Sequence, residues 1–343
     1  MAKEKFEQTA RAGFAFHTVM KLLVIFSFLL FPFSFLAQSG RQTDQQPTRP
    51  RRVEPPSQDE KPIKLSADLV TVITSITDAA GNQVNNLSQK DFEVYEDNAL
   101  QELAGFYRED QLPLRLVFLF DTSTSIKHRF EFEQRAAAKF FRQVMRANDQ
   151  AAIVSVTDDP KIEMQFTSNV DRLVDALGQL RPKGATSLYD ALIMAARYLR
   201  PSEGRHVMVV LSDGTDTTSL ANYAQALAEV QKSDAVIYGV HSTGVAPSAN
   251  VQDLAGEFAL KNMCEDTGGR AFFPPIYEDQ KKESRDLDEI YKRLAAEVRA
   301  QYVLTYYAHS DARAGTFRSI QVRVKRPDLQ LQVRARRGYY TSK

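Results

Sequence analysis

The chain of 343 residues contains a single cysteine, Cys264, so no intramolecular disulfide can form. Stability must therefore come from a packed core, and the sequence does not suit an animal extracellular module held together by cystines. Cys264 lies in a predicted helical segment that ends at Gly268 and Gly269. A small buried apolar role suits this cysteine better than a nucleophilic one.

Net charge is almost absent, because 44 Lys and Arg residues balance 43 Asp and Glu residues. A nucleic-acid-binding domain would show clustered basic residues. The nearest such cluster, residues 49–52, is short and lies in a proline-rich stretch that is typical of a solvated linker. We therefore expect no nucleic-acid partner.

A single long apolar run, residues 22–36, follows Lys21. It has roughly the length of a signal-peptide core and is shorter than a comfortable membrane span. Ala37 and Ser39 supply the small residues that a signal peptidase reads. Residues 1–39 are therefore predicted to be a signal peptide, which would direct the protein to the periplasm, the cell envelope or the medium. The alternative is an uncleaved anchor that associates with the inner membrane and leaves the rest of the chain outside the cytoplasm.

Residues 40–62 are rich in Gln, Pro, Arg, Asp and Ser and predict a disordered linker. Residues 63–110 form a predicted β segment. Within it, residues 69–78 are rich in β-branched side chains, and further strands are expected at 92–97 and 101–107.

Residues 111–301 alternate between apolar runs and helical periodicity, which predicts an α/β domain with a doubly wound, mostly parallel sheet. Strands are expected at residues 114–120, 151–157, 161–166, 207–211, 235–241 and 271–273. Helical segments are expected at residues 137–145, 173–180, 188–199, 220–232, 251–265 and 287–301. Pro160, between two of the strands, indicates a tight antiparallel hairpin at the sheet edge.

The pattern returns to strands in residues 302–343, with candidates at 302–308, 317–324 and 329–335. A sheet of two or three strands is only marginally stable alone. We therefore expect these strands to pack with residues 63–110 in one small β module built from both flanks of the α/β domain.

Polar side chains follow the apolar run 116–120 at the point where a buried strand would leave the sheet. The run is followed directly by Asp121, Thr122, Ser123, Thr124 and Ser125. In such a turn every second side chain, here at positions 121, 123 and 125, can point to one place outside the sheet. These side chains could together bind a cation. Asp, Ser and Thr also cap helices and stabilise turns, so this segment alone is compatible with a cation site and with a helix cap.

Two later segments favour the cation site over the helix cap. Thr186 lies in the Gly-containing stretch 184–188, just before a predicted helix, and Asp213 follows the apolar strand 207–211. Three loops would then present oxygen atoms from one edge of one sheet. Carboxylate and hydroxyl oxygens suit a hard divalent cation such as Mg²⁺.

This pattern resembles the von Willebrand factor type A domain with its metal-ion-dependent adhesion site, including related bacterial domains. The family pattern is DxSxS, then a Thr in a Gly-containing loop, then an Asp after a later buried strand. The resemblance implies five metal-site residues, namely Asp121, Ser123, Ser125, Thr186 and Asp213. Thr124 and Ala185 stand where many members have Gly, and Ile126 where bacterial members often have Met, but no ligand oxygen is lost.

The resemblance implies Mg²⁺, with Mn²⁺ or Ca²⁺ as alternatives, bound chiefly by Asp121 and by hydroxyl groups. Asp213 would act through a water or by holding those hydroxyls. An open coordination position would suit an acidic residue of a protein partner. The predicted function is therefore metal-dependent adhesion or assembly by an exported bacterial envelope protein that is not an enzyme.

Enzymatic motifs are missing from the expected positions. A phosphotransferase of the haloacid dehalogenase type needs a second Asp where Ser123 stands, and the chain contains neither a Gly-Lys-Ser/Thr phosphate loop nor a G-x-S-x-G elbow. His206 and His241 are expected in core or edge roles, and Asp190 and Asp216 as caps. A metal-dependent phosphatase and a structural module with an inactive metal site remain as alternatives.

Overall fold

The computed structural model describes residues 68–108, 111–124, 129–242, 251–275, 280–308 and 313–341. The predicted signal peptide or anchor and the linker lie outside these ranges. Among the described residues, none of the helices combines the length and the hydropathy needed to span a membrane.

A six-stranded sheet forms the centre of the α/β domain, in the order β10-β9-β8-β5-β6-β7. Its strands are β5 (Leu114–Asp121), β6 (Gln150–Val156), β7 (Lys161–Thr167), β8 (Arg205–Ser212), β9 (Val236–His241) and β10 (Arg270–Phe272). All neighbouring pairs are parallel except β6 and β7, which form the antiparallel edge hairpin predicted around Pro160. The doubly wound, mostly parallel sheet is confirmed.

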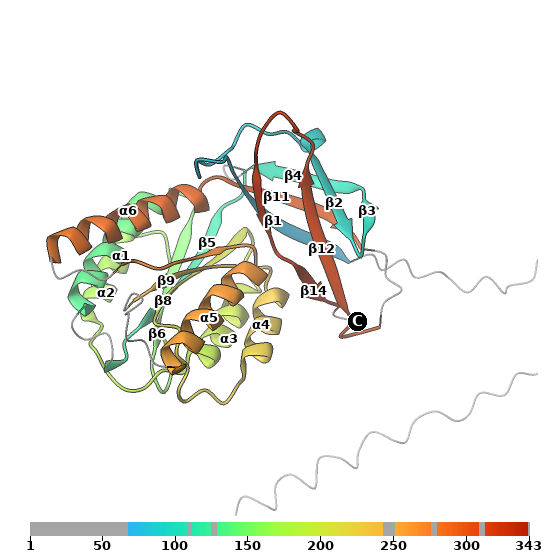
Figure 1. Cartoon of the computed structure of the whole chain (residues 1–343). Helices are drawn as coiled ribbons and strands as arrows, with labels where there is room; N and C mark the ends of the chain where they lie inside the picture. The colour runs from blue at the N-terminus through green and yellow to red at the C-terminus, as the bar shows by residue number, and fades with distance from the viewer. Residues whose placement is uncertain are drawn as a thin grey trace, which may run out of the picture. The chain divides into compact units, whose positions relative to one another are not determined.

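Helices cover both faces of this sheet (Figure 1). They are α1 (Phe130–Val144), α2 (Val170–Gln179), α3 (Leu188–Leu199), α4 (Tyr223–Lys232), α5 (Val251–Asp266) and α6 (Gln280–Val298). Alternate residues of β5 point to opposite faces. Phe118 therefore packs in one core with residues of α1, α2 and α6, whereas Val117 packs in a second core with residues of α3, α4 and α5.

The flanking segments form two four-stranded sheets, ordered β13-β1-β11-β4 and β14-β12-β2-β3. Their strands are β1 (Leu69–Thr77), β2 (Phe92–Glu96), β3 (Ala99–Gln101), β4 (Leu103–Arg108), β11 (Gln301–Tyr307), β12 (Phe317–Val324), β13 (Gln332–Ala335) and β14 (Gly338–Tyr340), and Gln89–Asp91 form a short 3-10 helix η1. Strands from the two ends of the chain pair directly, β1 with β11 and β2 with β12. One core, with Val72 and Tyr302 from the first sheet and Val94 and Val322 from the second, lies between them.

Helix starts differ most from the sequence expectations. Helix α6 begins at Gln280 and not at residue 287, because residues 280–286 are polar and add helical turns without apolar periodicity. Helix α4 begins at Tyr223 and not at residue 220. Asn222 accepts a hydrogen bond from the amide of Gln225 and caps the helix, and the apolar side chain that suggested the earlier start, Leu220, is 98% exposed.

Candidate metal centre

Asp121 is the last residue of β5, a strand that lies between β6 and β8 in the sheet. Its side chain is completely buried. One carboxylate oxygen, Oδ1, accepts a hydrogen bond from the backbone amide of Ser123 at 2.8 Å. The other, Oδ2, accepts one from the hydroxyl of Ser212 at 2.7 Å. These two donors hold the carboxylate at the carboxyl-terminal edge of the sheet.

Electrostatics at Asp121 disfavour a negative charge in the absence of a cation. Burial raises the pKa of Asp121 to about 6, and the negative charge of Asp213 adds to this, whereas the hydrogen bonds from Ser212 and Ser123 oppose it. In the part of the chain that the structure describes, no Lys, Arg or His forms an ion pair with Asp121. A buried carboxylate with a like charge nearby favours a cation at this position.

The loop before α3 is joined to its two neighbours through backbone groups. The carbonyl of Thr122 accepts a hydrogen bond from the amide of Lys183, which connects this loop to the end of β5. On its other side, the amide of Thr186 donates to the hydroxyl of Thr217 at 3.0 Å, and the carbonyl of Thr186 accepts from the amides of Thr217 and Thr218. Thr186 itself is 5% exposed. The three predicted loops therefore form one hydrogen-bonded unit.

The loop after β8 carries Asp213 and is shaped by a glycine. The carboxylate of Asp213 accepts a hydrogen bond from the amide of Thr215 at 2.9 Å, and the hydroxyl of Ser212 accepts one from the amide of Gly214 at 3.1 Å. Gly214 has φ +79°, and a Cβ there would lie 2.2 Å from the carbonyl oxygen of Gly256 in α5. Only glycine permits both this conformation and this close approach.

Of the five predicted ligands, four lie in the described residues and Ser125 lies outside them. Ser123 is 4% exposed, and its backbone amide donates a hydrogen bond to the carboxylate of Asp121. The negative charge of Asp213 raises the pKa of Asp121. Thr186 is connected to both loops by the backbone hydrogen bonds given above. The role of these residues as metal ligands stays a prediction.

Two residues of the site were not among the predicted ligands. Ser212 positions Asp121, and its place directly before Asp213 at the end of a strand is the signal that could have revealed it. His241 ends β9 in register with Ser212 and is buried. Burial lowers the pKa of His241, which the negative charge of Asp213 opposes. Nothing in the sequence places His241 beside Asp213, because their proximity depends on the pairing of β8 with β9.

Asp190 and Asp216 hold loops in place, as predicted. The carboxylate of Asp190 accepts hydrogen bonds from the amides of Leu220 and Ala221, at 2.9 and 3.1 Å. That of Asp216 accepts from the amide of Tyr189 at the start of α3. Both carboxylates thus tie the start of α3 to the loop that follows β8.

The donor set fits a hard divalent cation in kind. Two carboxylates and several hydroxyls come from loops that are hydrogen-bonded to one another, and oxygen is the ligand that Mg²⁺ and Mn²⁺ prefer. Among the described residues, no group of three or more His, Cys, Asp or Glu side chains is arranged to hold a metal ion. The candidate site therefore depends on hydroxyl ligands as well as on Asp121 and Asp213.

Residues 116–215 match the family described as von Willebrand factor type A domain. This stretch runs from β5 through β8 and includes Asp121, Thr186 and Asp213. A comparison with curated proteins finds no match.

Several solved structures are similar to part of the chain. The PilB minor pilin from Streptococcus sanguinis is 13% identical with a TM-score of 0.40, and the match covers 55% of this chain and 62% of the pilin. An aerotolerance-related membrane protein from Bacteroides fragilis is 17% identical with a TM-score of 0.42, and the match covers 54% of this chain and 98% of that one. The protein BatB from Bacteroides thetaiotaomicron is 17% identical with a TM-score of 0.38, with 53% and 98% covered.

The family match lies on the same strands that carry the candidate site. Its first residue, Leu116, lies in β5, and its last, Thr215, lies in the loop after β8. The chain therefore contains a von Willebrand factor type A domain, which the family match locates at residues 116–215.

Proposed function

We propose that the chain binds a divalent cation, Mg²⁺ or Mn²⁺, at Asp121, Ser123, Ser125, Thr186 and Asp213, and through it grips an acidic residue of a protein partner. The observation that carries this proposal is the buried carboxylate of Asp121. It is positioned by Ser212 and accompanied by the carboxylate of Asp213, with no cationic side chain of the described residues paired with it.

The balance of charge explains why a partner would be held. Hydroxyl groups are neutral ligands, so direct ligation by the Asp121 carboxylate would leave a divalent cation with one of its two positive charges uncompensated, while Asp213 would act through a water or by holding the hydroxyls. A carboxylate from a second protein is the natural group to complete such a ligand set. The site also lies at the carboxyl ends of parallel strands, where open α/β sheets bind their ligands.

We propose that the protein acts outside the cytoplasm. The apolar run of residues 22–36 with small residues after it supports export. We infer an adhesion or assembly module in the periplasm, the cell envelope or the medium. A signal peptide that is then cleaved would direct its export, or an uncleaved N-terminal anchor would hold it at the membrane.

Titration calorimetry with Mg²⁺ and with Mn²⁺ tests the metal site. The wild-type chain should bind one cation, and Asp121→Ala should bind none. Asp328→Asn serves as the matched control, because Asp328 is an exposed carboxylate outside the α/β domain that pairs only with Arg326 among the described residues. Equal binding by wild type and Asp121→Ala would overturn the metal assignment.

A pull-down from bacterial envelope extract tests the partner. Bait protein with Mg²⁺ should retain proteins that are lost with EDTA and with Asp121→Ala but not with Asp328→Asn. Retention that survives both treatments would contradict metal-bridged binding. A colorimetric phosphatase assay on the same preparations distinguishes the hydrolase alternative, which predicts Mg²⁺-dependent turnover that Asp121→Ala abolishes.

A further inference from the structure

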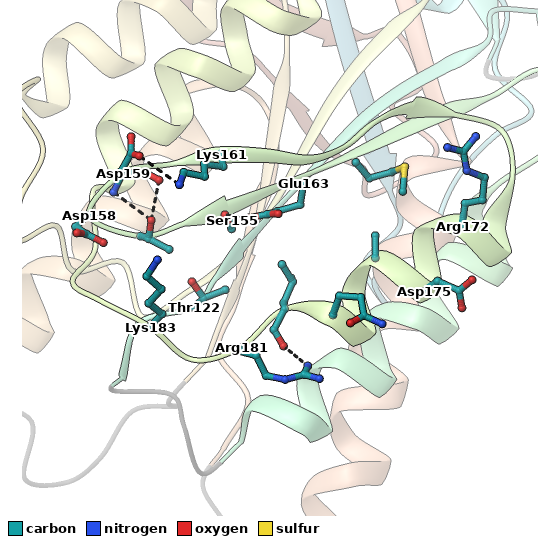
Figure 2. Close-up of a pocket in the computed structure, with 15 residues that line it drawn as sticks. Thr122, Ser155, Asp158, Asp159, Lys161, Glu163, Arg172, Asp175, Arg181 and Lys183 are labelled. Atoms are coloured by element: carbon teal, nitrogen blue, oxygen red, sulfur yellow. Dashed lines mark hydrogen bonds and ion pairs between the residues drawn. The ribbon is translucent and has the colours of Figure 1, made fainter.

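A cleft of about 830 Å³ opens beside the candidate metal centre, between the β6–β7 hairpin and α2 (Figure 2). Thr122, Asp158 and Lys183 lie at one end of it, and Arg172 and Asp175 at the other. Its volume is within the range of pockets that hold ligands.

The end of the cleft at Thr122 is built from the loops of the metal centre. Thr122 stands between Asp121 and Ser123, its amide donates to the carbonyl of Val156 at 3.1 Å, and its carbonyl accepts from the amide of Lys183. The cleft and the candidate site therefore share a wall.

The β6–β7 turn is attached to the loop that carries Thr186. The hydroxyl of Ser187 donates to the carbonyl of Asp158 at 3.2 Å, and the amide of Ser187 donates to the carbonyl of Thr157 at 3.0 Å. Gly184 lies against Asp158 so closely that a Cβ at Gly184 would be 2.5 Å from Oδ1 of Asp158. The turn at this end of the cleft is thus fixed to the loop that carries Thr186.

Charged groups of both signs line the cleft. Lys161 pairs with Asp159 at 3.5 Å, and the hydroxyl of Ser155 donates to Glu163 at 2.7 Å. Lys183 forms no ion pair with any residue that the structure describes. The same holds for Arg172 and Asp175 at the far end of the cleft.

This mixture of charges decides between ligand classes. A polyanion such as a nucleic acid or a polyphosphate would meet the carboxylates along the whole length of the cleft. A polypeptide suits it better, because its backbone offers donors and acceptors alternately and its side chains can carry either charge.

We propose that the cleft holds the stretch of the partner polypeptide next to the acidic residue that binds the metal, and that Lys183 pairs with a second carboxylate of that stretch. The inference rests on the proposed function and deepens it by naming the partner as an extended segment with two acidic residues. Lys183 lies at the metal-centre end of the cleft, and its ammonium group forms no ion pair with the described residues.

A displayed library of twelve-residue random peptides with one fixed Asp, panned on the full chain in Mg²⁺, supplies the probe. Recovered peptides are synthesised with a fluorophore, and their affinity is measured by anisotropy. Lys183→Glu should weaken binding at least tenfold, because it places a like charge against the second carboxylate. Lys325→Glu, in β-rich residues outside the α/β domain, is the matched control and should leave the affinity unchanged.

A second measurement locates the peptide independently of Lys183. Cys264 is buried and is the one native cysteine, so an exposed cysteine introduced by Gln179→Cys in the cleft can be labelled selectively with an environment-sensitive dye. Peptide addition should shift the emission of this label. A label at Ala224→Cys on α4, which belongs to the layer on the opposite face of the sheet, should not respond.

The outcomes separate the two proposals. Loss of peptide binding with EDTA and with Asp121→Ala, together with the Lys183→Glu effect and the Gln179 signal, supports both. Metal-dependent binding that Lys183→Glu leaves unchanged, or that shifts only the Ala224 label, overturns the cleft but keeps the metal site. Peptide binding that is indifferent to EDTA and to Asp121→Ala overturns the proposed function itself.

Discussion

Two buried carboxylates, one in each part of the described chain, have opposite surroundings. Glu96 in the β module is 3% exposed and accepts hydrogen bonds from the hydroxyls of Tyr306 and Tyr339, at 2.6 and 2.9 Å, while Arg318 pairs with it at 2.8 Å. Asp121 in the α/β domain is completely buried, and its nearby charge is the carboxylate of Asp213.

The difference separates a carboxylate that serves stability from one that serves binding. Glu96 is neutralised and fully engaged within the protein, and so it holds β2, β11, β12 and β14 together. Asp121 is positioned by hydroxyl and amide donors but not neutralised among the described residues. Buried charge without a counter-charge costs free energy of folding, which a bound cation would recover.

The largest expected effect is the loss of stability when Glu96, the carboxylate with a counter-charge, is replaced. Glu96→Ala leaves the buried hydroxyl of Tyr306, the half-buried hydroxyl of Tyr339 and the guanidinium of Arg318 without their acceptor, so we expect a loss of about 3 kcal/mol in the free energy of unfolding. Asp121→Asn, measured in EDTA, should cost less than about 1 kcal/mol, because it removes an unfavourable charge. Urea unfolding followed by circular dichroism compares the two, and an equal loss would show that Asp121 is also a structural carboxylate.

Metal addition gives the next largest effect. A cation at one hundred times its Kd should stabilise the wild-type chain by about 2.7 kcal/mol. The same addition should not stabilise Asp121→Asn, whereas Glu96→Ala should still respond if it folds. Thermal unfolding with and without Mg²⁺ measures the difference, and a response in Asp121→Asn would place the cation elsewhere.

A smaller expected effect, on Mg²⁺ affinity, tests whether α5 positions the loop that carries Asp213. A Cβ at Gly256 would lie 2.7 Å from the amide nitrogen of Thr215 and 2.8 Å from the carbonyl carbon of Gly214. Gly256→Ala must therefore displace the loop that carries Asp213, and we expect about tenfold weaker Mg²⁺ binding, or about 1.4 kcal/mol. Gly178→Ala in α2 is the control, since its Cβ would meet no atom within 4 Å and its affinity should equal that of wild type.

The smallest effect concerns a carboxylate of α4 that is neutralised at the surface. Hydrogen bonds from Lys232, Arg200 and Arg197 lower the pKa of Glu229 from 4.5 to about 2. A lowered pKa in the folded state means that this stabilisation is present above pH 4.5 and is lost as the pH falls through about 2. Glu229→Gln should therefore cost less than about 1 kcal/mol at pH 7, and the gap between variant and wild type should close toward pH 2. Denaturation midpoints across this pH range check it.

Most elements of the α/β domain follow from local pattern, because a buried parallel strand needs a continuous apolar run and a surface helix needs a 3.6-residue stripe. Helix α3 was predicted at its observed residues, Leu188–Leu199. Elements without such a stripe were not predictable. The first turns of α6 are polar in sequence, and β14 spans three residues, so neither carries a local apolar pattern. The two separate sheets of the β module depend on pairings between residues more than 200 positions apart.

From the sequence alone, Asp121, Thr186 and Asp213 could be assigned to loops at one edge of one sheet, because parallel strands end on the same side. The surroundings of these residues could not be predicted from the sequence. Burial of Asp121, the hydroxyl of Ser212 against its carboxylate, His241 in register beside Ser212, and the cleft between the β6–β7 hairpin and α2 all arise from contacts between distant segments. Side-chain type and order are local properties of a chain, whereas desolvation, charge proximity and shape exist only once the strands have paired.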